Sequence, residues 1–214
     1  MISVKQTFQS RVSEIETYFN FIDAFLLTNQ NENLKKILKS NLILMLYNLI
    51  ESTMANAVEE IHNDIHSNSV SFNALKLEIR EEIISLLKKR NPLKFVNSIN
   101  DLAIDIVKRS FRREETFSGN IDSSKIIDLS EVYGFSTRTV YAQTKNGQCL
   151  VEIKGKRNDL MHGTFSFTEI GKDYSIQDLE KMKREATCYL SEILDNIEYY
   201  LLNKGYLQPH AEVV

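Results

Sequence analysis

Apolar residues recur every three or four positions through most of the chain, which is the period of an amphipathic α-helix. The pattern predicts a first helix over residues 3–27, which ends at the polar turn 28–31. A second helix is predicted over residues 33–65, and its middle, residues 42–47, is apolar on all sides. Because a helix that is apolar all round belongs in the centre of a bundle, we expect the second helix to be the core of the fold.

Shorter helices follow. Apolar spacing predicts one over residues 72–89 and, after the break at Pro92, another that ends in the basic cluster 108–113. Asp122 or Ser123 suits the N-cap of a short helix that stops at Gly134, and residues 135–147 have the least regular pattern. Helix resumes near residue 148. A long final helix over residues 176–203 begins with a capping-box pattern at 175–178.

Two segments near the C-terminus are predicted not to be helical. Residues 164–168 alternate polar and apolar side chains, which is the pattern of an extended arm or a short hairpin. Residues 206–214 follow Gly205 and are expected to form a flexible tail. The expected fold is therefore all-α: an antiparallel helical bundle of about six to seven helices with this arm, in a single domain over residues 1–205.

The composition agrees with one helical domain and limits how the chain binds nucleic acid. With 214 residues, 43% of them apolar and 26% charged, the chain is able to bury one sizeable core. All seven glycines fall at or after residue 119, so the first half contains few helix breakers. The net charge is −3, so any contact with RNA must come from a local basic patch.

The composition also favours an intracellular protein. Cys149 and Cys188 are isolated and lack the spacing of a metal site, which suits a reducing compartment. The N-terminal residues lack the apolar core of a signal peptide, and the longest apolar run, residues 42–47, is too short to cross a bilayer. We therefore expect a cytoplasmic protein with no membrane partner.

The densest chemistry lies in residues 154–163. Arg157 and His162 bracket Asn158 and Asp159, and Gly163 follows. On a helix Asn158 and His162 share a face, whereas Arg157 lies roughly 140° away from His162 around the axis. Gly163 suits the left-handed residue that ends a helix, which places His162 in the last turn, where the helix dipole favours a protonated imidazole.

An arginine and a histidine near one helix end suit phosphodiester chemistry. The guanidinium is a planar fork that matches phosphate oxygens, and the imidazole exchanges a proton near neutral pH. The same residue types also occur at helix C-termini simply because they bond the last carbonyls. Spacing alone leaves both interpretations open.

Three segments together resemble one known family. Arg157 to His162 fits the R-x4-6-H motif of the HEPN superfamily, with a polar residue after the arginine. The stretch IKGKRNDLMHG at 153–163, with YNLIES at 47–52 and FSGNID at 117–122, is similar to the MAE-type branch of HEPN-like nucleases. The segments stand in order over more than half of the chain, so the resemblance is more specific than the short motif.

The resemblance implies a metal-independent endoribonuclease that uses no cofactor. The RNA 2′-hydroxyl attacks the adjacent phosphate, leaving a cyclic phosphate, at a composite site on a homodimer interface. In this chain the resemblance assigns catalysis to Arg157 and His162. The supporting residues are Asn158, Asp159, Asn48 and Glu51, and the RNA-binding residues are Lys154, Lys156, Arg109, Arg112 and Arg113.

The resemblance also implies a biological setting. We expect a toxin or antiviral defence effector, with RNA as substrate and a cognate antitoxin or defence-system protein as partner. The alternative is a HEPN-like module that binds nucleotides or proteins without cutting RNA. The net charge of −3 fits this alternative.

Several residues have both a functional and a structural interpretation. Glu51 and Asn48 either face the motif helix or mark where the second helix emerges into solvent. The basic cluster 108–113 either tracks RNA or is a solvated helix end. Asp159 either pairs with Arg157 or holds His162.

Two further features concern ligands. Gly155 weakens its helix by roughly 1 kcal/mol, which suggests close approach of another backbone or a ligand. His62 and His66, with Glu59 one turn earlier, have a metal-like spacing. No third and fourth ligand of convincing spacing follows, so we expect these histidines to lie on a solvated helix end and predict no metal.

Overall fold

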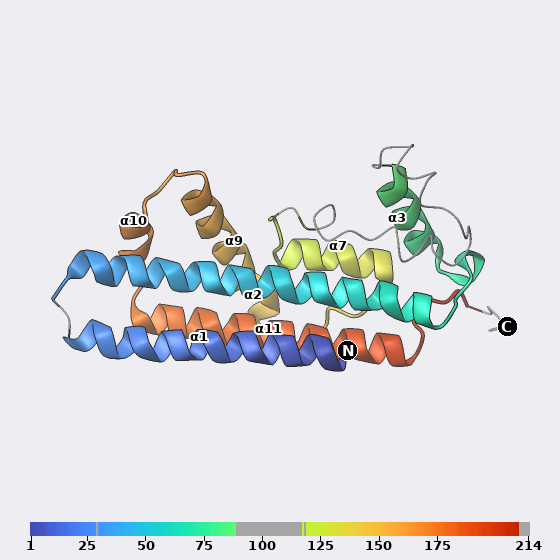
Figure 1. The fold of residues 1–214 in the computed structure, drawn as a ribbon, viewed down its shortest axis with the longest axis horizontal. Coiled ribbons are helices and arrows are strands. Elements are labelled where there is room, and N and C mark those ends of the chain that lie inside the picture. The colour runs from blue at the N-terminus through green and yellow to red at the C-terminus, as the bar shows by residue number, and fades with distance from the viewer. Residues whose placement is uncertain (29, 89–116, 118, 210–214) are drawn as a thin grey trace.

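Three long helices run side by side and form the body of the molecule (Figure 1). The computed structural model describes residues 1–28, 30–88, 117 and 119–209. The long helices are α1 (Ile2–Thr28), α2 (Glu32–Ser67) and α11 (Ile176–Leu202), and α2 contacts both of the others. The described part of the chain has no β-strand and one isolated antiparallel bridge. The predicted all-α helical bundle is thus confirmed.

The shorter helices lie along α2 on the side opposite α1 in Figure 1. They are α3 (Leu77–Lys88), α7 (Ser123–Tyr133), α9 (Gln148–Met161) and α10 (Phe167–Gly171). The turn of 3-10 helix η1 (Phe72–Ala74) precedes α3, and α8 (Tyr141–Thr144) with η2 (Lys145–Gly147) leads into α9. The helix expected after Pro92 and the basic cluster 108–113 lie outside the described residues.

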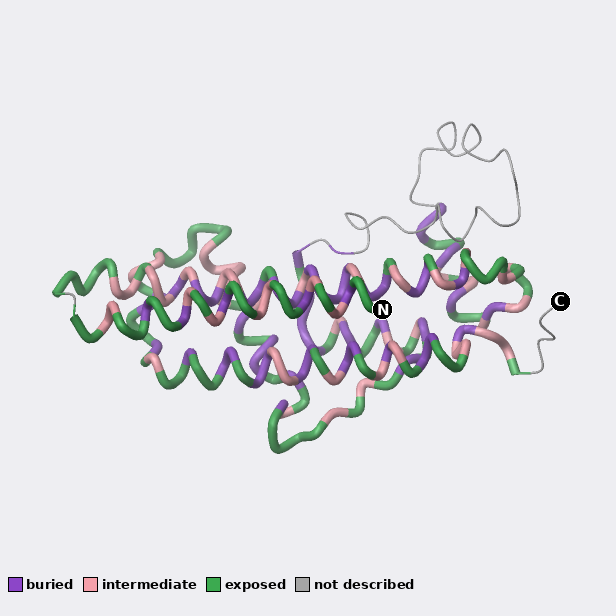
Figure 2. The backbone as a smooth tube through the Cα atoms, turned by 60° about the horizontal axis from the view of Figure 1, so that its bottom comes forward, coloured by how far each residue is buried: buried purple, intermediate pink, exposed green. Residues whose placement is uncertain are grey.

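The central position of α2 follows from its sequence. Asn31 caps the helix, because its side chain accepts a hydrogen bond from the backbone N–H of Leu34. In the predicted apolar middle Leu42, Ile43, Leu46 and Tyr47 are buried whereas Leu44 and Met45 are half-buried, and buried positions recur up to Ile65 near the end of the helix. Figure 2 shows buried stretches in purple along the long helices. None of the described helices combines the length and the apolar character that a membrane span requires.

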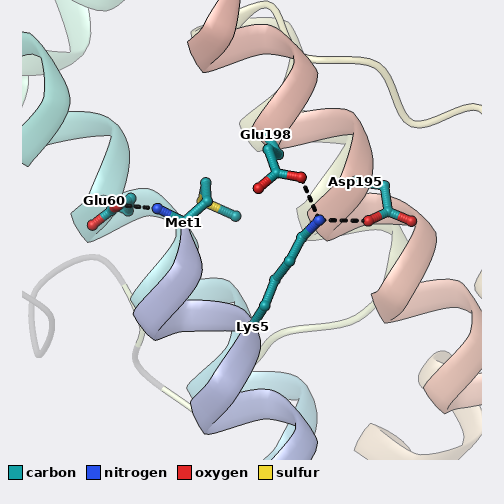
Figure 3. Close-up of polar contacts among 5 residues, drawn as sticks. All are labelled: Met1, Lys5, Glu60, Asp195 and Glu198. Atoms are coloured by element: carbon teal, nitrogen blue, oxygen red, sulfur yellow. Dashed lines mark hydrogen bonds and ion pairs between the residues drawn. The ribbon is translucent and has the colours of Figure 1, made fainter.

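Ion pairs hold the start of α1 against its neighbours (Figure 3). Lys5 Nζ lies 2.7 Å from Asp195 Oδ1 and 2.5 Å from Glu198 Oε2, both on α11. The amino group of Met1 pairs with Glu60 on α2. Because partly exposed ion pairs contribute only about 0–1 kcal/mol each, these contacts set the register of the three helices more than they stabilise the fold.

Residues 164–166 form a short irregular connection and α10 begins at Phe167, so the predicted extended arm or hairpin over residues 164–168 is wrong. Ser166 and Glu169 form a capping box that starts α10, and five residues of alternation were too few to specify a strand. Helix α10 packs closely on α2: a Cβ on Gly171 would lie 1.9 Å from the backbone oxygen of Lys36. Glycine is therefore required at this crossing.

The start of the predicted flexible tail is part of the fold. Tyr206 is fully buried, and its hydroxyl donates to Asp64 Oδ2 at 2.9 Å. Its carbonyl accepts from the backbone N–H of Lys76, and the N–H of Gln208 donates to the carbonyl of Ala74. The tail prediction is therefore wrong for residues 206–208, because these long-range contacts leave no local sequence signal.

The prediction that His62 lies on a solvated helix end is also wrong. His62 is buried, and its Nε2 lies 2.8 Å from the Tyr133 hydroxyl of α7, which covers this side of α2. Within the described ranges, no three His, Cys, Asp or Glu side chains are grouped closely enough to hold a metal ion.

Candidate functional site

The helix that carries the motif ends as predicted. His162 is the C-cap of α9, and Gly163 follows it in the left-handed conformation, with φ of 68°. The N–H of Gly163 donates to the carbonyl of Leu160 at 3.2 Å, and the N–H of Thr164 donates to that of Asp159 at 2.9 Å. These two bonds form a Schellman motif. They fix the backbone at His162, whose side chain is exposed and has no hydrogen-bond partner among the described residues.

Arg157, in contrast, is held by three protein groups. Its guanidinium carbon lies 4.7 Å from the centre of the Tyr47 ring on α2. Its Nη1 donates to the carbonyl of Gly119 at 3.2 Å and to Asn158 Oδ1 at 3.0 Å. A guanidinium has five N–H donors, and Nη2 and Nε form no hydrogen bond within the described chain. Nη1 is therefore held by two oxygen atoms, whereas Nη2 and Nε have no protein acceptor among the described residues.

Gly119 makes room for this guanidinium. Its φ is 77°, a conformation that side chains other than glycine rarely adopt. A Cβ at this position would lie 2.8 Å from Arg157 Nη2 and 3.2 Å from Nη1, which is closer than van der Waals contact allows. The glycine of the FSGNID segment is thus explained by both its backbone conformation and its contact with the motif arginine.

Asn120 and Ile121, which follow Gly119 in the FSGNID segment, contact the motif segment and the YNLIES segment. Asn120 Oδ1 accepts from Asn158 Nδ2 at 3.4 Å, and the N–H of Ile121 donates to the Tyr47 hydroxyl at 3.4 Å. The three segments that carry the sequence resemblance therefore meet in space. Their contacts bring together α2, the turn before α7, and α9.

Asp122 joins two helices at the edge of this site. Its carboxylate caps α7 by accepting from the backbone N–H of Lys125 at 3.0 Å, and it pairs with Lys154 of α9. Burial opposes ionisation of Asp122, but the bonds from Lys154 and Lys125 outweigh it and hold the pKa of this carboxyl below its usual range. Lys154, predicted to bind RNA, is thus used within the protein.

The charge of Glu51 on α2 affects the pKa of Tyr47, which lies four residues earlier on the same helix. Burial raises the pKa of Tyr47 to about 12, the N–H of Ile121 opposes the rise, and the nearby Glu51 carboxylate adds to it. The tyrosine is therefore protonated at neutral pH. Glu51 is half-buried and Asn48 is exposed, so the two polar residues of this helix have different surroundings.

The remaining predicted residues are not all brought to this site. Among the described residues, no ion pair or side-chain hydrogen bond joins Asp159 to Arg157 or to His162. Lys156 is half-buried and has no ion-pair partner in the described chain. Gly155 is exposed, and a Cβ there would meet nothing within 4 Å, so no other described part of the backbone approaches it. The predicted RNA-binding residues Arg109, Arg112 and Arg113 lie outside the described residues.

Sequence reasoning missed four residues of the site. Tyr47, Gly119, Asn120 and Asp122 contact the motif helix, yet none was assigned to the site, although Asp122 was a predicted helix N-cap. All four lie within the segments YNLIES and FSGNID. The signal was therefore present in the segments, although their contacts became visible only in the folded chain.

The described chain is an all-α bundle, and its Arg–x4–His motif lies at the end of a helix that packs against the central helix α2. This arrangement is that of a nuclease-like module of the HEPN type. A family model described as HEPN_MAE_28990-like HEPN matches residues 3–206, so the chain belongs to the MAE_28990-like HEPN family. The match covers nearly the whole chain and confirms the resemblance of the three segments. Comparison with curated proteins and with solved structures gives no match.

Proposed function

We propose that this protein is a metal-independent endoribonuclease whose site is completed by a second copy of the chain. The observation that carries the proposal is the placement of Arg157, whose guanidinium is held through Nη1 while Nη2 and Nε have no acceptor in the described chain. The Nη2–Nε edge of a guanidinium matches two phosphate oxygens. Membership of the HEPN family supports a nuclease-like module.

In the proposed reaction, the oxygen of an RNA 2′-hydroxyl attacks the adjacent phosphorus. The bond between phosphorus and the 5′-oxygen breaks, which yields a 2′,3′-cyclic phosphate and a free 5′-hydroxyl. One proton leaves the 2′-hydroxyl and one must reach the 5′-oxygen. His162 carries protons as general acid or base, and Arg157 stabilises the negative charge that develops on the phosphate oxygens.

The separation of the two motif residues supports a dimeric site. Arg157 is directed to α2 and the 119–121 turn, whereas His162 lies exposed at the end of α9 without a contact to Arg157 in the described chain. Two copies that face each other supply two guanidinium groups and two imidazoles. One imidazole then accepts the proton from the 2′-hydroxyl while the other donates to the leaving oxygen.

Other groups support the proposal in different ways. Asn158 orients Arg157 through its Oδ1 and is itself oriented by Asn120. Lys156 is the basic residue of the motif helix that remains for the RNA backbone, because Lys154 is paired with Asp122. The toxin or defence role, the cytoplasmic location and a cognate inhibitor or sensor protein belong to the same proposal, and they rest on the family alone.

A cleavage assay tests the proposal. Purified wild type and the His162→Ala variant are incubated with end-labelled RNA in excess chelator, and the fragment ends are identified. Fragments with cyclic phosphate ends from the wild type alone support the proposal. Equal cleavage by both proteins, or cleavage that the chelator abolishes, overturns it.

A second candidate is a HEPN module that binds nucleotides or protein without cutting RNA. The pairing of Lys154 with Asp122 and the net charge of −3 favour it, because both reduce the positive charge offered to RNA. Expression without a partner distinguishes the two functions. A ribonuclease slows growth, and alanine at Arg157 or His162 relieves the effect; a binding module leaves growth unchanged.

A further inference from the structure

The proposed site depends on an arginine that packs against one buried aromatic side chain. We propose that Tyr47 is a positioning residue: its ring supports the Arg157 guanidinium in the orientation that Gly119 and Asn158 complete. The catalytic consequence rests on the proposed ribonuclease function. The placement of Arg157 by Tyr47 is testable without any cleavage.

The Tyr47 ring is a rigid support. Tyr47 is 1% exposed, which leaves its ring no solvent-filled space in which to move. Its hydroxyl is held at the far end of the ring by the backbone N–H of Ile121, at 3.4 Å. The guanidinium carbon of Arg157 lies 4.7 Å from the ring centre, within the range of a cation–π interaction.

Tyr47 and two oxygen atoms together determine how Arg157 lies. The ring covers one side of the guanidinium, while the carbonyl of Gly119 and Asn158 Oδ1 occupy the Nη1 donors. An unrestrained arginine side chain samples many rotamers and must lose that freedom when it binds a phosphate. Here the restriction is already present before substrate binds, which is the condition for efficient stabilisation of a transition state.

The chain offers a matched control for the loss of such a ring. Phe19 is buried like Tyr47, and Lys183 Nζ lies 4.2 Å from the centre of its ring. Phe19→Leu and Tyr47→Leu therefore each remove a buried aromatic ring from beneath a cation. Only Tyr47→Leu affects the motif arginine, whereas both variants carry a similar loss of core packing.

Steady-state RNA cleavage tests the catalytic role. Tyr47→Leu is expected to lower kcat by about tenfold to a hundredfold with little change in KM, whereas Tyr47→Phe, which keeps the ring, stays within about fivefold of wild type. Phe19→Leu is expected to leave kcat unchanged. Equal kcat for Tyr47→Leu and Phe19→Leu overturns the proposal.

An NMR measurement separates this inference from the proposed function. The Arg157 Nε–H signal, assigned by its loss in Arg157→Lys, is expected to carry a ring-current shift in wild type, Tyr47→Phe and Phe19→Leu and to lose it in Tyr47→Leu. If wild type cuts no RNA, the proposed function fails, and this signal still decides whether Tyr47 places the guanidinium. A signal that is unchanged in Tyr47→Leu overturns the positioning role.

Discussion

Replacement of Gly119 by alanine tests the geometry of the site through a single methyl group. The added Cβ would lie 2.8 Å from Arg157 Nη2, whereas ordinary contact begins near 3.4 Å, so the guanidinium must retreat by about 0.6 Å. The contacted atoms end a flexible side chain, so the arginine moves rather than the backbone. Its 3.2 Å hydrogen bond to the Gly119 carbonyl is lost or lengthened as a result.

The expected cost to stability is smaller than the cost to function. Alanine at a φ of 77° destabilises the fold by about 1–2 kcal/mol. A displaced catalytic guanidinium lowers the rate by about a hundredfold. Thermal unfolding and kcat for RNA cleavage, measured on the same preparation, should therefore show a modest fall in Tm and a large fall in kcat.

Gly134 provides the control for this substitution. It also has a left-handed backbone, with φ of 90°, and a Cβ there would lie 2.7 Å from Lys76 Nζ, another flexible cationic side chain. Gly134→Ala is therefore expected to lower Tm as Gly119→Ala does while leaving cleavage intact. Equal rates for Gly119→Ala and wild type, or equal loss of rate in both variants, would refute the reasoning.

Three other predictions concern stability and reactivity. Asp122→Asn keeps an oxygen for the cap of α7 but removes the ion pair with Lys154, and should lower the free energy of unfolding at pH 7 by about 1–3 kcal/mol. Because folding lowers the pKa of Asp122, this contribution to stability is present above the unfolded pKa of about 3.9 and is lost as the pH falls through the folded pKa. Urea unfolding at neutral pH and in acid below the folded pKa should therefore show the variant's loss of stability at neutral pH alone. Burial raises the pKa of Cys149 to about 12, so iodoacetamide should label the more exposed Cys188 first in the native protein, and mass spectrometry showing the reverse order contradicts this. Tyr206→Ala should cost about 3–5 kcal/mol in chemical unfolding, whereas a free tail would give no measurable change.

Most of the helical fold was predictable because its signals are local. The apolar period identified α2 and α11, and Gly163 marked the end of α9 through its left-handed conformation. The arm at residues 164–168 was mispredicted because five alternating residues do not specify a strand, and the capping-box spacing of Ser166 and Glu169 is a local helix signal in the same segment. Tyr206 gave no local signal at all, since its burial depends on residues distant in sequence.

The site was predictable as a set of segments but not as a set of contacts. The motif residues Arg157 and Asn158 were identified from spacing and resemblance, and both take part in the observed arrangement. Tyr47 looked like part of an apolar core, and no local pattern reveals that its ring faces a cation. Lys154 was assigned to RNA because the charge of Asp122, 32 residues earlier, meets it only when α7 and α9 pack.

The contacts that hold Arg157 also determine which pieces of the chain lack an ordered guanidinium. Gly119 lies 38 residues before the arginine, and Ile121 lies 74 residues after Tyr47. Closing loops of this size has an entropic cost that is recovered only when the surrounding helices pack. A nascent chain that has not yet passed α9, or a proteolytic fragment that lacks α2, therefore cannot hold the arginine in place. The guanidinium of Arg157 therefore becomes ordered only after most of the polypeptide has been synthesised and folded.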